Sequence, residues 1–392
     1  MSWKVTDVVN QRTRFVKDHL SGLYTMAELC RAYRISRQTG YECLEHFNQE
    51  GWPGLADHPR APKNHPNQTP PQLEQPILQL RYEHPRWGAR KLRGHLDEKF
   101  PQLPWPANST IGNLLQREGL AVPRKKRRRT PPYTQPLQAI GQPNDLWCAD
   151  FKGWFKTSDG ERIDPLTMTD AHSRYLLRCQ AVDAANLAQV KGIYVAAFRE
   201  YGTPLTIRTA NGAPFASRAI AGLSRLSVWL MKLGIIPERI QAGHPEQNGR
   251  HERMHATMKA ETAQPPEANR RAQQRRFDQF RFEYNEVRPH EALDQKTPAS
   301  RYQASPRCYP ERVPEPEYPD GMQVRRVMRH GGFYWKHQEV FLPEVLEGEA
   351  VGLEAVDDRY WLVHFAAFPI ACFDSQELRI QPLPKHADAN HK

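Results

Sequence analysis

Two carboxylates, Asp150 and Glu252, are the residues of this chain whose surroundings point to chemistry. Asp150 lies in an apolar run that predicts a buried strand, and Glu252 lies near the start of a polar segment that predicts a helix. Between them, residues 207–215 predict a short buried strand that runs into a turn and contains Ala210. Phosphodiester chemistry can use two Mg²⁺ ions roughly 3.5–4 Å apart, held by a few carboxylates. A site of that kind would draw a third carboxylate from position 210, where this chain has alanine.

The residues around these positions predict a mixed five-stranded sheet covered by helices. Three strands in a meander come first and strands joined by helical crossovers follow, which is the strand order of a ribonuclease-H-like core. In such a sheet Asp150 lies on the first strand, position 210 follows the fourth strand beside it, and Glu252 lies one turn into a helix over the sheet edge. The predicted strands are residues 146–155, 162–170, 174–182, 205–209 and 235–240, and the predicted helices are residues 185–201, 217–233, 247–261 and 270–286.

The helix that carries Glu252 also offers groups that could bind phosphate. Glu252, His255 and Lys259 are spaced i, i+3 and i+7, so we expect them to share one helix face. From that face Lys259 could reach a DNA phosphate beside the metal ions. Asn248 and Gly249 predict a flexible polar loop at the start of the helix, and we expect Asn248 to contact DNA as well.

Length and composition favour a multidomain protein with a polyanionic partner. The chain has 392 residues, which is too long for one ordinary domain. It carries 55 Lys and Arg against 44 Asp and Glu, a formal net charge of +11, which is typical of nucleic-acid-binding proteins, although a basic protein without that role would share it. The six cysteines are scattered without a CxxC pair, which argues against a zinc knuckle or a disulfide framework. No apolar run suggests a signal sequence or a membrane span, so we expect a soluble cytoplasmic protein without membrane contact.

Residues 1–55 predict a helix-turn-helix domain. Thr25 and Glu28 form a capping-box pattern, and Ser36 can cap a second helix over residues 37–49. The first side chains of that helix would enter the major groove of DNA. An ordinary helical hairpin is the alternative for this pattern taken alone. The candidate base-contacting residues are Arg37, Gln38, Thr39 and Tyr41.

A second helical domain is predicted after a linker, and its last helix is expected to begin with a side-chain cap at Asn108 or Ser109. Thr110 and Asn113 would then face outward toward DNA, which makes this domain a second helix-turn-helix candidate. Two such domains in tandem would recognise a longer DNA site than either domain alone. The linker covers residues 56–71 and the domain residues 72–121.

A run of six cations joins the helical half of the chain to the predicted core. Such a run repels itself and stays extended unless it meets phosphates, so we expect it to contact DNA; a solvated linker is a compatible alternative. After the core, a proline-rich stretch leads to strand-like runs that predict a small β-barrel. The cations are Arg124, Lys125, Lys126, Arg127, Arg128 and Arg129. The predicted parts are the basic linker 122–143, the core 144–305, the proline-rich linker 306–320, the barrel 321–382 and a disordered tail 383–392.

Several motifs occur together in this chain. The predicted core contains Asp150, Arg208-Thr209-x-Asn211-Gly212-x-Pro214-Phe215, Pro245-x-x-Asn248-Gly249-x-x-Glu252-Arg253, and Tyr284-Asn285-x-x-Arg288-Pro289-His290-x-Ala292-Leu293 followed by Thr297-Pro298-Ala299. The N-terminal half contains Arg31-x-Tyr33-x-Ile35-Ser36-Arg37-x-Thr39-x-Tyr41 and His84-Pro85-x-Trp87-Gly88-Ala89-Arg90. With these motifs, residues 20–303 resemble the DDE transposases of bacterial insertion sequences, which are relatives of retroviral integrases.

The resemblance implies a ribonuclease-H-like core that cleaves DNA at transposon ends and joins the freed 3′-hydroxyl to target DNA. Asp150 and Glu252 match the first and last catalytic carboxylates, which in the family bind two Mg²⁺ ions, with Mn²⁺ as a possible substitute. The implied partner is double-stranded DNA, both terminal inverted repeats and target, and holding two ends implies at least a dimer on DNA. The implied location is the bacterial nucleoid. Ala210 stands where the family has its second carboxylate.

Because alanine cannot bind a metal ion, we expect this chain to bind DNA without cutting it. Asn211 is not expected to substitute, since neighbouring strand residues point to opposite faces. Three origins stay open: a substitution introduced to trap a DNA complex, decay of a transposon copy, and retention of the protein for DNA binding. The alternative function is therefore a non-catalytic, sequence-specific DNA-binding regulator. A nuclease of the same fold is a further alternative, against which the two helix-turn-helix candidates and the basic linker argue.

Overall fold

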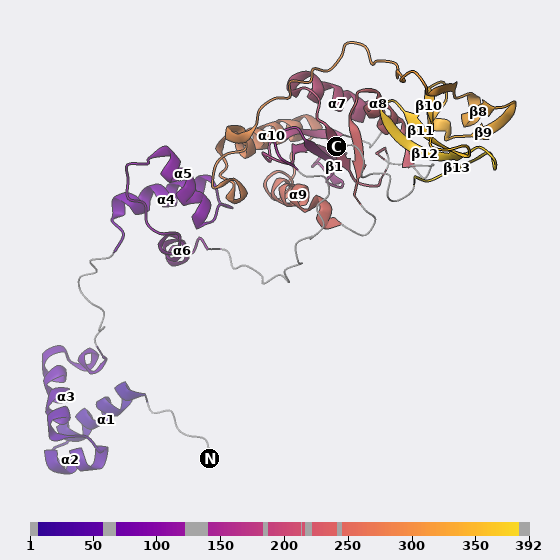
Figure 1. Cartoon of the computed structure of the whole chain (residues 1–392). Helices are drawn as coiled ribbons and strands as arrows, with labels where there is room; N and C mark the ends of the chain where they lie inside the picture. Colours follow the sequence, from indigo (N-terminus) through magenta and orange to yellow (C-terminus); the bar gives the residue numbers. More distant parts are fainter. Residues whose placement is uncertain are drawn as a thin grey trace. The chain divides into compact units, whose positions relative to one another are not determined.

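The computed structural model describes residues 7–57, 68–121, 140–182, 187–212, 214–215, 222–240 and 245–383. These fall into two compact units, Met1–Pro70 and Pro71–Lys392 (Figure 1). The six cations at residues 124–129 lie outside the described residues, as do nearly all of the predicted tail and part of the helix predicted over 217–233. Within the described ranges, no helix combines the length and the apolar character needed to cross a membrane. The finer division into domains stays a prediction.

The first unit is a three-helix domain that contains the predicted helix-turn-helix. α2 begins at a capping box, in which the side chains of Thr25 and Glu28 each accept the other residue's backbone N–H. It ends at Arg34 in the left-handed conformation (φ 56°), and Ser36 Oγ accepts the Thr39 N–H at 3.1 Å to start α3. The helices are α1 (Val8–Leu20), α2 (Met26–Tyr33) and α3 (Arg37–Glu50), followed by the 3₁₀ turn Trp52–Leu55.

The second unit opens with three helices that pack around the buried side chains of Trp87 and Trp105. The side-chain cap predicted at Asn108 or Ser109 is wrong. The last helix already includes Asn108, so Ala107 occupies the capping position and makes no side-chain bond there. The helices are α4 (Pro71–Glu83), α5 (Ala89–Lys99) and α6 (Asn108–Arg117).

A mixed sheet forms the centre of the second unit, as the sequence predicts. β1, β3 and β4 form an antiparallel meander, and β5 and β6 add to β1 in parallel, which gives the ribonuclease-H-like order β4-β3-β1-β5-β6. The predicted strand 146–155 is broken at residues 152–154, and its end is the short strand β2, which also pairs with β3. The strands are β1 (Leu146–Phe151), β2 (Phe155–Lys156), β3 (Arg162–Asp170), β4 (Leu176–Val182), β5 (Thr206–Thr209) and β6 (Ile236–Arg239).

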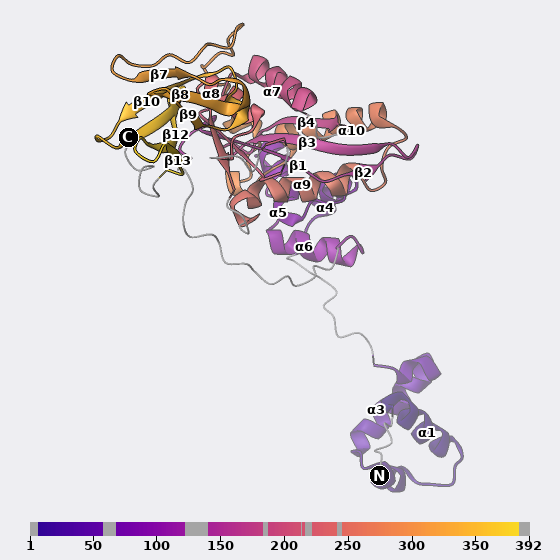
Figure 2. The same cartoon turned by 90° about the vertical axis from the view of Figure 1, so that its right-hand side faces the viewer.

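Helices cover both faces of this sheet, so alternate residues of a strand face different layers. Leu166 and Met168 of β3 pack in one apolar cluster with α7 and α8, whereas Ile163 packs with α9 and α10. Figure 2 shows α7 and α9 on opposite sides of the sheet. The helices are α7 (Leu187–Tyr201), α8 (Arg225–Lys232), α9 (Gly249–Thr262) and α10 (Arg270–Phe282), which the π-helical turn Glu283–Val287 extends.

Amide side chains of α10 and its π-helical turn cover the outer edge of β4. Asn285 Oδ1 accepts the Leu176 N–H at 2.8 Å, and Asn285 Nδ2 donates to the Leu176 carbonyl at 3.0 Å. Gln274 likewise accepts the Ala181 N–H at 2.8 Å and donates to the Cys179 carbonyl at 3.0 Å. Backbone groups at a strand edge otherwise stay unpaired or invite another strand. These amides therefore close the sheet and fix α10 against it.

The C-terminal domain is an antiparallel β structure, as predicted. It consists of a sheet in the order β13-β12-β11-β10-β7 and the hairpin β8-β9. The sheet and the hairpin share one apolar core, to which α8 contributes Val228 and Met231. The strands are β7 (Gln323–Arg326), β8 (Gly332–Trp335), β9 (Gln338–Phe341), β10 (Ala350–Ala355), β11 (Tyr360–Phe365), β12 (Phe368–Asp374) and β13 (Arg379–Gln381). Further 3₁₀ turns are Pro245–Asn248, Glu291–Leu293, Ala299–Arg301, Arg329–Gly331 and Glu344–Leu346.

Candidate active site

The fold brings the carboxylates of Asp150 and Glu252 into electrostatic contact. Asp150 lies near the end of β1, half-buried, and its Oδ1 accepts the Phe151 N–H at 2.8 Å. Burial raises the pKa of Asp150 to about 6; the Phe151 N–H opposes this rise and the negative charge of Glu252 adds to it. Glu252 is exposed in the first turn of α9. Two carboxylates that repel each other at a partly buried place favour a cation there.

Position 210 directly follows β5, the strand that pairs with β1. The parallel pairing ends with Ala149 opposite Thr209, and continuing this register by one residue would set Ala210 opposite Asp150. Alanine offers no metal ligand at that place. Asn211 Nδ2 donates to the backbone carbonyl that follows β6 at 2.8 Å, so this amide is engaged elsewhere. In the part of the chain that the structure describes, no three His, Cys, Asp or Glu side chains are grouped to hold a metal ion.

A buried hydrogen-bond network joins α9 to β3. Thr167 Oγ1 lies 2.8 Å from His251 Nε2 and 2.6 Å from His255 Nε2. Thr169 Oγ1 lies 2.7 Å from His251 Nδ1. Burial lowers the pKa of both imidazoles, to about 3 for His251 and about 2 for His255, so both are neutral at pH 7. A hydroxyl can donate one bond and accept others, so these groups satisfy one another without charge.

This network links the two candidate carboxylates. Thr167 is the β3 partner of Asp150 in the β1–β3 pairing, and Glu252 directly follows His251 in α9. The position of Glu252 relative to Asp150 therefore depends on buried hydrogen bonds behind the site. The motifs around Asp150 and Glu252 do not by themselves indicate this role for the two histidines and the two threonines. Its signal is a histidine pair at i and i+4 of a helix, together with threonines at i and i+2 of a strand.

Two polar residues of this region, His255 and Asn248, are buried. Glu252 and Lys259 are exposed, as expected, but His255 is only 4% exposed. At about 100° per residue, Lys259 returns to within about 20° of Glu252, whereas His255 lies about 60° away, on the side of the sheet. Asn248 is also 4% exposed, in a 3₁₀ turn rather than an open loop, and its Oδ1 has no hydrogen-bond partner among the described residues. The side chain of Asn248 is thus buried beside the start of α9, and the DNA contact stays a prediction.

The motif at residues 284–290 makes contacts that fix the position of α9, the helix that carries Glu252. Arg288 Nη1 bonds to Glu261 Oε1 at 2.7 Å, which ties the end of α10 to the end of α9. The His290 ring packs edge-on against Tyr284, with ring centres 4.6 Å apart. Together with the bonds of Asn285 to β4, these contacts give the motif a structural role, since it fixes α9 to α10 and α10 to the edge of the sheet.

The side chains predicted to contact DNA in the helical domains are exposed. In α3, Gln38 and Thr39 also bond within the protein, to Glu42 at 3.0 Å and to Ser36 at 2.8 Å. Exposure is compatible with DNA contacts, and the contacts themselves stay predictions. The exposed residues are Arg37, Gln38, Thr39 and Tyr41 of α3 and Thr110 and Asn113 of α6.

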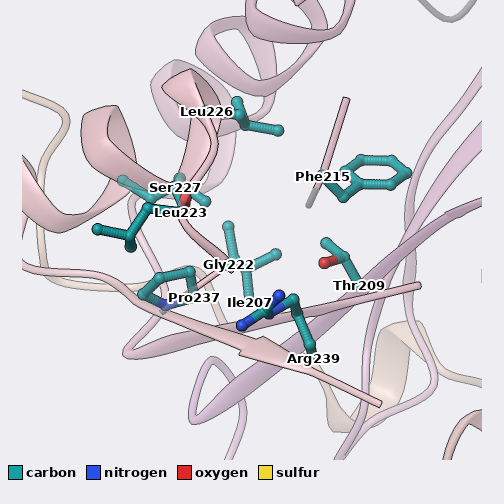
Figure 3. A pocket seen from close by; sticks show the side chains of 10 residues that line it. Ile207, Thr209, Phe215, Gly222, Leu223, Leu226, Ser227, Pro237 and Arg239 are labelled. Atoms are coloured by element: carbon teal, nitrogen blue, oxygen red, sulfur yellow. The ribbon is translucent and has the colours of Figure 1, made fainter. Parts of the chain in front are cut away.

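A small cavity lies between α8 and the strands β5 and β6, and Figure 3 shows side chains of all three elements around it. Its volume is about 40 Å³, which holds only a few water molecules. Gly222 and Arg239 close one part of it, because a Cβ at Gly222 would overlap the Arg239 guanidinium. The cavity is therefore a gap in the packing behind β5 and not a substrate pocket.

Replacing Thr167 by valine should loosen α9, since it removes the hydroxyl that both imidazoles contact. Each polar group left unpaired costs about 1–3 kcal/mol of unfolding free energy. Thr167→Ser, which keeps the hydroxyl, should cost at most about 1 kcal/mol. Urea unfolding measures the stability, and hydrogen exchange of the α9 amides measures the local effect. Equal stability and equal exchange in the two variants would show that the network does not hold the helix.

His255 should also make stability depend on pH. Its pKa falls from 6.5 to about 2 on folding, so below pH 6.5 the unfolded chain binds a proton that the folded chain excludes. The contribution of the neutral His255 to the unfolding free energy is therefore fully present above pH 6.5. It is lost as the pH falls, by up to about 1.4 kcal/mol per pH unit. His255→Gln should make the decline between pH 6.5 and 5 shallower by about that slope, whereas His172→Gln, at an exposed position, should leave it unchanged. Identical slopes for wild type and His255→Gln would refute the buried neutral imidazole.

The chain matches four protein-family models. Two described as "Integrase core domain" match residues 141–245 and 233–298, which cover the central sheet and α9. A "Homeodomain-like domain" matches residues 39–115, and a "Helix-turn-helix domain" matches residues 11–63. The integrase-core matches contain Asp150, Ala210 and Glu252, and the other two cover the helical half of the chain.

Two proteins of bacterial insertion elements are similar to this chain. The "Insertion element IS407 uncharacterized 31.7 kDa protein" of Burkholderia multivorans is 30% identical over 62% of this chain and 83% of its own length. The "Insertion element IS476 uncharacterized 39.2 kDa protein" of Xanthomonas euvesicatoria is 31% identical over 57% of this chain, which spans 62% of that protein.

Among solved structures, the HTLV-2 integrase catalytic core domain in complex with magnesium is 16% identical, over 41% of this chain and 95% of its own, with a TM-score of 0.29. A simian T-cell lymphotropic virus intasome is 17% identical, over 75% of this chain and 96% of its own, with a TM-score of 0.36. Because these scores are low, the assignment depends on the family models and on the insertion-element relatives. The chain belongs to the integrase-core proteins of bacterial insertion elements, the DDE transposase family.

Proposed function

We propose that this chain is a transposase that binds the terminal inverted repeats of an insertion element and lacks one catalytic carboxylate. With aspartate at position 210, it would cleave DNA at the element's ends and join them to target DNA. One observation carries the proposal: the pairing of β1 with β5 sets position 210 beside Asp150, with Glu252 in electrostatic contact. In this chain, Ala210 leaves that arrangement with two carboxylates.

The donor chemistry of the site fits Mg²⁺, which prefers oxygen ligands and keeps several waters. Asp150 and Glu252 would hold the metal, two ions in the intact site, and Mn²⁺ could substitute. When bound, the ions would stabilise the attacking and leaving oxygens of phosphodiester transfer. The protein's own part is to hold two mutually repelling carboxylates close together, through β1 for Asp150 and through the His251–Thr167 contact for Glu252. Losing one group of such a site typically costs a factor of about 10²–10³ in rate or more.

DNA binding is supported by the helix-turn-helix and homeodomain-like matches and by the net charge of +11. The exposed side chains of α3 and α6 would contact the terminal repeats, and the cations at residues 124–129 would contact phosphates of the same DNA. Lys259, exposed on the same face of α9 as Glu252, would hold a phosphate near the site. Because transposition holds two ends together, at least a dimer forms on DNA, with the bacterial nucleoid as its location.

A DNA-binding regulator derived from a transposase is the second candidate, and Ala210 is the observation that favours it. Such a protein would keep its fold, because β5 retains its pairing with β1 and β6 without a carboxylate at 210. It would bind terminal repeats and repress transcription equally well with alanine or aspartate at that position. The two candidates therefore differ in what Ala210→Asp restores.

Ala210→Asp should restore strand transfer. The substrate is DNA with the terminal repeats that flank the gene, and the assay measures Mg²⁺-dependent joining of labelled ends to a plasmid. We expect a gain of at least about 100-fold over the alanine chain, and none when Asp150→Asn is added to Ala210→Asp. If Ala210→Asp binds the same DNA but joins nothing, the catalytic proposal fails and the regulator is favoured.

A further inference from the structure

An exposed tryptophan lies next to the candidate site. Trp154 is 57% exposed, in the break between β1 and β2 that follows Asp150. Gly153 has a φ of 87°, a conformation that favours glycine, so the break is a built turn and not an irregular strand end. A single exposed apolar side chain is common on protein surfaces. Its meaning therefore depends on what surrounds it.

Trp154 forms part of the lining of a groove between the β1–β2 break and the C-terminal half of α9. The groove also has an apolar part, Phe155 and Met258, and two lysines, Lys152 and Lys259. Neither lysine has an ion-pair partner among the residues that the structure describes. The volume of the groove is about 260 Å³, whereas a water molecule occupies about 30 Å³ of the liquid, so there is room for a planar ring system.

The charges around this groove suit one class of ligand. The Arg162 guanidinium lies 5.1 Å from the centre of the Trp154 ring and is already paired with Asp164 at 2.9 Å. Lys152 lies close enough to Asp150 to lower the pKa of that carboxyl, and Lys259 has no ion-pair partner among the described residues. An aromatic ring beside an apolar surface and flanked by cations is the arrangement that binds single-stranded nucleic acid, since bases stack and phosphates meet the cations.

We propose that this groove binds an unpaired nucleobase of the DNA strand held at Asp150 and Glu252. Trp154 stacks on the base, and Lys152 and Lys259 contact the phosphates on its two sides. The inference rests on the proposed function, since it places the base beside the bond to be cut or joined. Unpairing a base near a strand end costs a few kcal/mol, which stacking on tryptophan offsets in part. Because every base has a π face, the groove accepts bases without strong sequence preference.

The test compares Trp154→Ala, Trp154→Phe and wild type on two mixed-sequence duplexes, one blunt and one with a single-stranded overhang that carries 2-aminopurine. Wild type should bind the overhang duplex more tightly than the blunt one and quench the 2-aminopurine fluorescence by stacking. Trp154→Ala should weaken overhang binding roughly 5- to 100-fold and abolish the quenching, with blunt-duplex affinity unchanged. Trp154→Phe, which keeps an aromatic face, should retain most of both effects.

Tyr334→Ala is the matched control, because Tyr334 of the C-terminal domain is a similarly exposed aromatic, 56% against 57%. It should leave overhang binding and quenching unchanged, and thermal unfolding should show that each variant is folded. If wild type binds both duplexes but Trp154→Ala keeps full overhang affinity and quenching, the groove does not bind a base. If wild type binds neither duplex, the proposed DNA function fails instead.

Discussion

The parallel pairing of β1 with β5 is the contact on which the candidate site depends. It brings position 210 beside Asp150, although a meander of strands and the helix α7 separate them in sequence. One face of this pairing is covered by α7 and α8, whose apolar side chains pack in one cluster with Trp147, Ala149 and Ile207. Ala210 is the first residue after β5, so its place in the fold follows from the end of a paired strand.

Glu252, the third position of the candidate site, is held in place by polar contacts and not by strand pairing. Glu252 is exposed, and its helix is fixed by the buried bonds of His251 and His255 to Thr167. Farther along, Arg288 and Glu261 tie α9 to the end of α10, and amides of α10 cover the edge of β4. Buried polar groups stabilise a fold only when each finds a partner. Because these groups are paired with one another, they hold α9 in one orientation against the sheet. None of these contacts involves Ala210, so the placement of Glu252 does not depend on the side chain at that position.

The sequence predicts the sheet well, because strand periodicity is a local signal, and it places Asp150 and Glu252 on the strand and the helix that carry them. It does not predict what depends on contacts between distant segments. Asn248 reads as part of a polar loop, but the turn before α9 buries it. The spacing groups His255 with Glu252 and Lys259 on one helix face, but His255 packs against Thr167 of β3. The break at Gly153 was hidden within one long predicted strand, because a single positive φ leaves the apolar pattern intact. Residue spacing gives the face of a helix on which a side chain lies, but it does not give the element that packs against that face.

We propose that positions 150, 210 and 252 belong to one metal site, in which this chain lacks the ligand at position 210. Calorimetric titration with Mn²⁺ tests it most directly, on this chain, on Ala210→Asp, and on Ala210→Asp combined with Asp150→Asn. We expect Ala210→Asp to bind Mn²⁺ more tightly than the alanine chain, by roughly tenfold or more, and adding Asp150→Asn to remove the gain. Equal affinity and stoichiometry for the alanine and aspartate chains would contradict it, because position 210 would then not belong to a metal site.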